Sequence, residues 1–287
     1  MLTEKENEEI RKELDNCTRP LIFFHDDADG VCSFLLLYRY KKEGKGVIVK
    51  STPKVDMKFL RKVEEYQPDK IFVVDVPMMD EEFVKNVKVP IIWIDHHTPQ
   101  NIDKVKYFNP RLSGTHEPAT ELCYGVVKRD LWIAQIGCVG DWFLPDFTDE
   151  FIKKYPKLLS KKIKTPEKAL FQSKLGELVR IISFILKGKI SDVMKSIKIL
   201  TRIQDPYEIL DNKTPQSNFI MKRYKKYNTE YQELLKEAKK RAKKDKFLIF
   251  IYKNTQNKYK LFPNIILLLR KEKKTQFFQF LMFFCMF

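Results

Sequence analysis

Short apolar runs alternate with helix-like stretches through the first 150 residues, and this alternation constrains the fold more than any other feature. The runs are apolar throughout, which is typical of strands covered on both faces of a parallel sheet. They are expected at residues 21–24, 46–51, 70–74 and 90–94, with helices at 31–42, 56–66 and 80–86. The pattern predicts a doubly wound, mainly parallel α/β sheet, in which ligands bind beyond the carboxyl ends of the strands.

Polar side chains gather where three of these strands end. They are His25, Asp27 and Asp29 in the run HDDADG, Asp75 alone, and Asp95, His96 and His97 in the run DHH. Alternate residues of an extended segment point the same way, so the HDDADG side chains could face one pocket. Carboxylates this close repel one another unless cations neutralise them. The alternative is an Asp-rich turn that caps the following helix, with Asp29 as N-cap.

Asp141 follows the run IGCVG and would indicate only a helix cap if it stood alone. Added to the strand-end groups, it gives four Asp and two His around one expected crevice. Carboxylate and imidazole ligands together suit Mn²⁺, and Mg²⁺ is the other candidate. Two such cations, about 3.5–4 Å apart and bridged by a carboxylate, would activate a water for in-line displacement at phosphorus.

The order of these motifs is strand–HxDxDG, strand–D, strand–DHH and then GD. It resembles the four motifs of the DHH phosphoesterase superfamily. That superfamily contains RecJ-type exonucleases, nanoRNases, cyclic dinucleotide phosphodiesterases, and related pyrophosphatases and polyphosphatases. The resemblance covers about residues 18–150, and the helical region to about 246 in general character.

The resemblance implies two divalent cations and a set of ligands for them. One cation would be held by His25 and Asp27, the other by Asp29, His96 and Asp141, with Asp75 bridging the two. Asp75 would therefore be a catalytic residue as well as a ligand.

The resemblance also gives His97 a catalytic role, as a donor that faces the substrate phosphate and stabilises developing charge. Asp95 would orient a histidine by hydrogen bonding. Two further phosphate contacts come from the residues themselves. Arg111, in Asn-Pro-Arg, could pair with a phosphate, the alternative being a loop charge. Thr115 precedes a helix expected near Pro118, where backbone N–H groups could hold a phosphate.

Charge is unevenly distributed along the chain. The first 150 residues carry 21 Lys and Arg against 27 Asp and Glu, whereas residues 151–246 carry 26 against 10. An acidic first part suits a metal site, and a basic second part suits a polyanion such as nucleic acid. Tyr224, Tyr227 and Tyr231 lie within the basic part and could stack bases or pack a helix. The alternative for the basic residues is a set of solvated helix faces.

Beyond residue 146 the pattern becomes helical, with helices expected at 165–186 and 191–200 and one long basic helix at 219–244. Residues 246–252 indicate a strand, and the residues from Leu261 onward hold two apolar runs. We expect a DHH metal-binding α/β domain (1–150), a helical region with a basic linker helix (151–246), and a truncated or atypical start of a C-terminal substrate-binding domain (247–287). The alternative for the tail is an edge strand and helix packed on the body.

These features predict a metal-dependent phosphodiesterase or exonuclease acting on single-stranded nucleic acid or short oligonucleotides. The alternatives are a small-molecule phosphohydrolase, acting on a cyclic dinucleotide, pyrophosphate or polyphosphate, and a non-catalytic nucleic-acid-binding subunit. RecJ-like members carry a glycine-rich patch that binds substrate in their second domain. The last glycine here is Gly188, so the sequence predicts no such patch in residues 247–287. No run of 18 apolar residues occurs and the five cysteines are scattered, so we expect a cytoplasmic protein with no membrane span.

Overall fold

The computed structural model describes residues 1–50, 53–242, 247–252, 265–271 and 278–284. A parallel five-stranded sheet in the order β2-β1-β4-β6-β7 organises the first part of the chain. Its strands are β1 (Pro20–His25), β2 (Lys45–Val49), β4 (Lys70–Val74), β6 (Ile91–Ile94) and β7 (Lys106–Phe108). The doubly wound α/β fold predicted from the sequence is confirmed. The short strand β7 was not predicted, because three residues give too little pattern.

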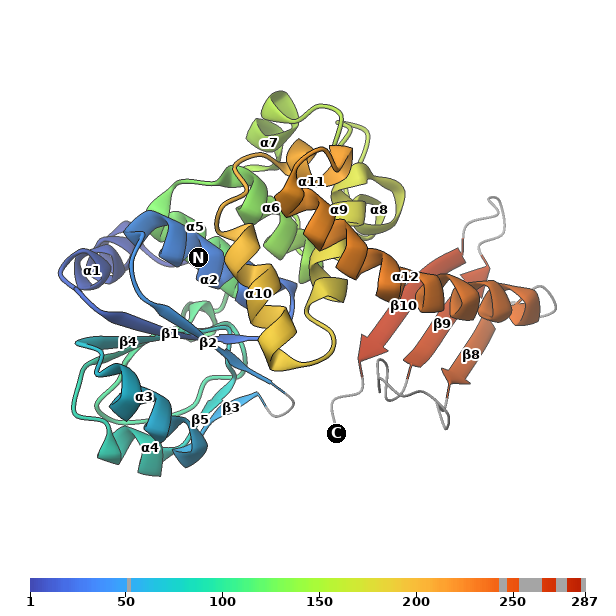
Figure 1. Cartoon of the computed structure of the whole chain (residues 1–287). Coiled ribbons are helices and arrows are strands. Elements are labelled where there is room, and N and C mark those ends of the chain that lie inside the picture. Colours follow the sequence, from blue (N-terminus) through green and yellow to red (C-terminus); the bar gives the residue numbers. More distant parts are fainter. Residues whose placement is uncertain (51–52, 243–246, 253–264, 272–277, 285–287) are drawn as a thin grey trace.

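Helices cover both faces of this sheet (Figure 1). One face carries α1 (Glu4–Asp15), α2 (Ala28–Lys41), α5 (Ala119–Val127) and α6 (Leu131–Gly140), and the other carries α3 (Leu60–Tyr66) and α4 (Glu81–Asn86). Successive strand residues alternate between the two cores: Phe24 and Phe72 pack with the first group, and Phe23 and Trp93 with the second. This alternation on a sheet buried on both sides explains why the strands are apolar throughout.

Short elements complete this part of the chain. The two-residue strands β3 (Lys54–Val55) and β5 (Met78–Met79) pair in parallel with each other. The 3₁₀ helix η1 (Met57–Phe59) precedes α3, so the helix expected at 56–66 consists of two pieces. A second 3₁₀ helix, η2 (Pro110–Ser113), follows β7.

In the described part of the chain, six helices follow α6. They are α7 (Thr148–Lys154), α8 (Pro166–Gln172), α9 (Lys174–Ile185), α10 (Ile190–Leu200), α11 (Pro206–Asp211) and α12 (Pro215–Ala242). The single helix expected at 165–186 is wrong, because Ser173 has extended backbone angles and its side chain accepts from Gly176 N as the N-cap of α9. The apolar spacing continues across this break and hides it in the sequence.

The long helix α12 confirms the helix expected at 219–244, although it begins earlier and residues 243–244 lie outside the described range. Tyr224, Tyr227 and Tyr231 are buried on it, so these rings pack the helix against the body and are not available to stack bases. Among the helices that the structure describes, none has the length and apolar character needed to cross a membrane.

A three-stranded antiparallel sheet, in the order β10-β9-β8, follows α12 (Figure 1). Its strands are β8 (Phe247–Tyr252), β9 (Ile265–Lys271) and β10 (Phe278–Phe284). The strand expected at 246–252 is thus confirmed from Phe247 onward, while Lys246 lies outside the described residues. The two later apolar runs are β9 and β10. The proposed domain boundaries stay a prediction.

Candidate metal centre

The order of the parallel strands places a ligand site at the carboxyl end of β1. In the sheet, β1 lies between β2 and β4 and pairs with both. The direction in which the chain winds along the sheet therefore reverses between β1 and β4. In doubly wound sheets this reversal opens a crevice beyond the strand ends. His25 is the last residue of β1 and Asp75 directly follows β4, so both lie at this position.

The HDDADG run changes from strand to helix within a few residues. Asp27 is the N-cap of α2, and its Oδ1 accepts from Gly30 N at 2.9 Å. Asp29 lies in the first turn of the helix, so the expectation that it caps α2 is wrong, and so is the extended geometry assumed for it. Gly30 serves close packing rather than a special turn, because a Cβ there would lie 2.6 Å from His25 O.

The backbone fixes the positions of Asp75 and Asp95, the acidic residues that directly follow β4 and β6. Asp75 N donates to Ile94 O at 3.0 Å and Asp95 N donates to Phe108 O at 3.1 Å, so the sheet ladder still holds each residue. Asp75 has a φ of 56°, in the left-handed region that Asp tolerates better than most residues. The chain therefore turns directly after β4 while the carboxyl group enters the crevice.

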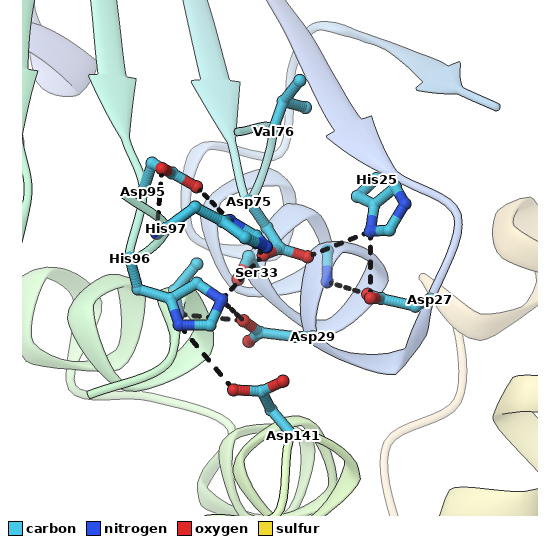
Figure 2. Close-up of polar contacts among 12 residues, drawn as sticks. His25, Asp27, Asp29, Ser33, Asp75, Val76, Asp95, His96, His97 and Asp141 are labelled. Atoms are coloured by element: carbon cyan, nitrogen blue, oxygen red, sulfur yellow. Dashed lines mark hydrogen bonds and ion pairs between the residues drawn. The ribbon is translucent and has the colours of Figure 1, made fainter. Parts of the chain in front are cut away.

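Asp75 lies between two groups of side chains (Figure 2). On what we call the β1 side, His25 Nδ1 lies 2.9 Å from Asp27 Oδ2 and 3.7 Å from Asp75 Oδ2. On what we call the α5 side, His96 Nε2 lies 3.2 Å from Asp75 Oδ1. The two oxygens of one carboxyl group thus face different sides, which is the arrangement that a bridging ligand requires.

The α5 side is completed by Asp29 and Asp141. His96 Nε2 lies 3.5 Å from Asp29 Oδ2, and His96 Nδ1 lies 3.7 Å from Asp141 Oδ2. The Asp29 carboxylate also accepts from Ala119 N at 2.9 Å and from Thr120 N at 2.7 Å, at the start of α5. Asp29 therefore caps a helix, but one that lies 90 residues away in the chain.

The acidic groups of the cluster repel one another when no cation is bound. Burial, and then repulsion from Asp27 and Asp29, raises the pKa of Asp75 well above its usual value. Burial, and then Asp29, raises the pKa of Asp141 to about 8. Burial lowers the pKa of His25, but the Asp27 carboxylate reverses this and raises it to about 11. Cations at the cluster would relieve the repulsion among these carboxylates.

The residues present suit divalent cations. Asp75 Oδ2 is buried and has no hydrogen-bond partner among the described residues, although it faces the centre of the cluster. A buried carboxylate oxygen without a partner is costly unless a cation binds it. Each side brings His and Asp ligand atoms within 4.8 Å of one another, and that donor set suits Mn²⁺ or Mg²⁺.

Part of the chain matches a known family. The model of the DHH family, N-terminal domain, matches residues 19–139. Residues 19–139 therefore form a domain of the DHH family. No curated protein sequence matches the chain.

The chain is also similar in fold to three solved structures. These are RecJ from Thermus thermophilus in complex with Mn²⁺ (17% identity, TM-score 0.56), exonuclease RecJ bound to manganese (15%, 0.56), and the DHH domain of a member of a family of ribosomal proteins (16%, 0.55). The matches cover 80%, 82% and 87% of this chain, and 38%, 67% and 64% of those chains. At such identities the likeness shows a shared fold.

The second histidine of the DHH motif is held in place by its neighbours. Asp95, which is fully buried, accepts from His97 N at 3.0 Å, and its Oδ1 lies 2.8 Å from His97 Nδ1. Asn109 donates to His97 O at 3.0 Å and to Tyr107 Oη at 2.7 Å. Sequence analysis missed this role of Asn109, although a polar residue directly after β7 fits the rule that identified the other strand ends.

The two further phosphate candidates differ in their surroundings. Arg111 is exposed and donates from Nε to His96 O at 2.6 Å, so it is attached to the DHH motif. Thr115 Oγ1 donates to Glu117 Oε2 at 2.6 Å and accepts from the Met1 amino group. The amides of Gly114 and Thr115 donate to carbonyl oxygens of η2. The N–H groups expected to hold a phosphate therefore already have acceptors, and a phosphate role for Thr115 stays a prediction.

Proposed function

We propose that this chain hydrolyses phosphodiester bonds in single-stranded nucleic acid or short oligonucleotides, using two divalent cations, with Mn²⁺ favoured over Mg²⁺. The observation that carries the proposal is the position of Asp75, whose two carboxyl oxygens face the β1 side and the α5 side separately. A single-cation site would need only one of these groups.

The ligands divide between the two sides as the DHH motifs imply. The β1 side would hold one cation through His25 and Asp27, the α5 side would hold the other through Asp29, His96 and Asp141, and Asp75 would serve both. Bound cations would activate a water and stabilise charge on the phosphoryl oxygens.

His97 would act on the substrate directly. Its Nδ1 faces Asp95, which fixes the ring and leaves Nε2 for a phosphate oxygen. The side chain is 36% exposed, whereas that of Asp95 is buried, so a substrate can reach the histidine but not its partner. Arg111, attached to the backbone of His96, would supply a further charge at the same edge.

Nucleic acid is proposed as substrate because of the charge that lies beyond the metal-binding part. Residues 151–246 carry 26 Lys and Arg against 10 Asp and Glu. The salt-dependent attraction between such an excess and a polyanion would concentrate a strand near the centre. One structure of similar fold is that of an exonuclease, RecJ bound to manganese.

The test is hydrolysis with Mn²⁺, measured side by side on a dinucleotide, a longer single strand, a cyclic dinucleotide and pyrophosphate. We expect the dinucleotide or the single strand to be cleaved fastest, and Asp75→Asn to abolish the cleavage. Faster hydrolysis of pyrophosphate or of the cyclic dinucleotide would refute the nucleic-acid proposal. Salt-dependent binding of the strand without any turnover would indicate a binding subunit instead.

A further inference from the structure

The first residues of α5 hold both the side chain and the backbone of Asp29. Thr120 N donates to Asp29 Oδ1 at 2.7 Å, and the Thr120 hydroxyl donates to the backbone carbonyl oxygen of the same residue at 2.9 Å. Ala119 N donates to Asp29 Oδ2 at 2.9 Å. Asp29 and Thr120 are both buried, so a hydrogen bond lost here is not replaced by one to water. The Asp29 carboxylate therefore has one favourable orientation, which α5 determines.

The Thr120 hydroxyl also lies where three helices meet. On α2, Ser33 Oγ lies 3.3 Å from Thr120 Oγ1. On α6, a Cβ added to Gly137 would lie 2.2 Å from Thr120 Oγ1 and 2.7 Å from Cys32 Cβ. Only a glycine allows α6 to come this close, so α6 packs directly against the hydroxyl. Thr120 thus contacts α2 and α6 at the same time.

The turn of α6 that packs against Thr120 is the one that ends at Asp141. Asp141 N donates to Gly137 O at 3.0 Å, which closes this last turn. Asp29 and Asp141 both face the His96 ring, with their Oδ2 atoms 3.5 Å from Nε2 and 3.7 Å from Nδ1 respectively (Figure 2). The separation of the two carboxylates therefore depends on how α2, α5 and α6 pack around Thr120.

The bonds from α5 still leave Asp29 able to bind a cation. A carboxylate offers about four lone-pair positions, and the amides of Ala119 and Thr120 use two of them. One ligand atom each from Asp29, His96 and Asp141 lies within 4.8 Å of the others. A group that fixes a ligand from behind affects how strongly the metal is held, although it does not touch the metal.

We propose that Thr120 is a positioning residue that sets the separation of Asp29 and Asp141, and thereby the affinity for a divalent cation on the α5 side. This inference rests on the proposed function, which assigns one cation to that side. The β1 side is held by other contacts, because Asp27 accepts from Gly30 N and lies beside His25 within one segment. The effect of Thr120 should therefore be confined to one of the two cations.

The experiment measures Mn²⁺ binding to EDTA-treated protein by calorimetry in Thr120→Ala and Thr120→Ser. Both variants lose the methyl group of threonine, and they differ from each other only in the hydroxyl. We expect Thr120→Ala to weaken one of two Mn²⁺ ions on the order of 10–100-fold, the usual cost of losing an outer partner of a metal ligand. Thr120→Ser should retain most of the affinity. Thr148→Ala, which removes another buried hydroxyl at the start of α7, should bind both ions like the wild type.

Double variants show which ion responds. In Asp27→Asn the remaining ion belongs to the α5 side, and adding Thr120→Ala should weaken it. In Asp141→Asn the remaining ion belongs to the β1 side, and adding Thr120→Ala should leave its affinity unchanged. Equal weakening of both ions, or equal affinities in Thr120→Ala and Thr120→Ser, would overturn the assignment.

Thermal unfolding in EDTA shows whether Thr120→Ala keeps the fold. If it does not, Thr120→Val, which has nearly the same volume and no hydroxyl, is compared with the wild type instead. Failure of the proposed function is a separate result, in which the wild type binds Mn²⁺ but cleaves no oligonucleotide, and calorimetry then still decides the role of Thr120. If Asp27→Asn binds no Mn²⁺ at all, the α5 side holds no cation of its own and the inference is refuted.

Discussion

Within the candidate metal centre, the two groups on either side of Asp75 differ in how the chain supplies them. The β1 side comes from one strand and the turn after it, and the Asp27 side chain is 48% exposed. The α5 side draws on α2, the DHH motif and the end of α6, and the Asp29 side chain is 2% exposed. One side comes from a single local segment, whereas the other exists only in the folded chain.

The largest expected effect is that of Asp75→Asn, which acts on both sides at once. We expect activity to fall by more than about 100-fold, because loss of an outer partner of a ligand alone costs roughly 10–100-fold. Mn²⁺ binding measured by calorimetry should fall from two ions per chain in the wild type to one or none.

Two matched variants test whether Asp75 differs from the ligands of a single side. Asp27→Asn should weaken one Mn²⁺ and leave the other, and Asp141→Asn should do the same for the opposite ion. If Asp75→Asn still binds two ions as tightly as the wild type, Asp75 does not bridge them, and the comparison between the sides fails.

A smaller effect concerns the stability of the metal-free protein as a function of pH. The pKa of Asp141 is raised to about 8 in the folded protein, above its value of about 4 in an unfolded chain. Between these values the folded state holds a proton that the unfolded state has released, so the free energy of unfolding falls as pH rises. Asp29 and Asp75 have their pKa shifted in the same direction. Thermal unfolding in EDTA should therefore occur at a lower temperature at pH 8 than at pH 5.

Variants of the two sides should also differ in how the unfolding temperature depends on pH. Asp141→Asn should flatten the fall between pH 5 and 8. Asp27→Asn should retain the part of the fall that Asp141 carries, because burial and Asp29 are the main causes of that raised pKa. It should lose the part that depends on the Asp27 charge, which raises the pKa of Asp75 and of His25. A metal-free protein whose unfolding temperature rises from pH 5 to pH 8 would show that the buried acids are not under strain.

The β1 side could be predicted from sequence and the α5 side only in part. His25 and Asp75 were found because a buried strand and the polar residue that ends it are local patterns. The bonds from Ala119 and Thr120 to Asp29 join residues about 90 positions apart, which no local pattern contains. Spacing placed Asp29 and Asp141 around one expected crevice, and only the resemblance to the DHH motifs assigned both to the same cation.

In the HDDADG run, capping a helix and facing a metal centre are compatible roles for one carboxylate. Asp27 caps α2 and Asp29 caps α5, yet both face the cluster. A carboxylate has two oxygens and several lone pairs, so it can accept from a helix N-terminus and still offer an oxygen to a cation. The cap also fixes the direction of the carboxylate.

The smallest expected effect is that of Asp26→Asn, in the same run as the proposed ligands. Asp26 Oδ1 lies 3.6 Å from His25 Nε2, and its Oδ2 lies 3.7 Å from Lys50 Nζ, so neither contact is a hydrogen bond. We expect kcat/KM to fall by less than about tenfold, below the usual cost of losing an outer partner of a metal ligand. Asp27→Asn, one residue further on, should cost far more. If Asp26→Asn is as damaging as Asp27→Asn, the β1 side uses Asp26 as a ligand, and the division of roles within HDDADG must be redrawn.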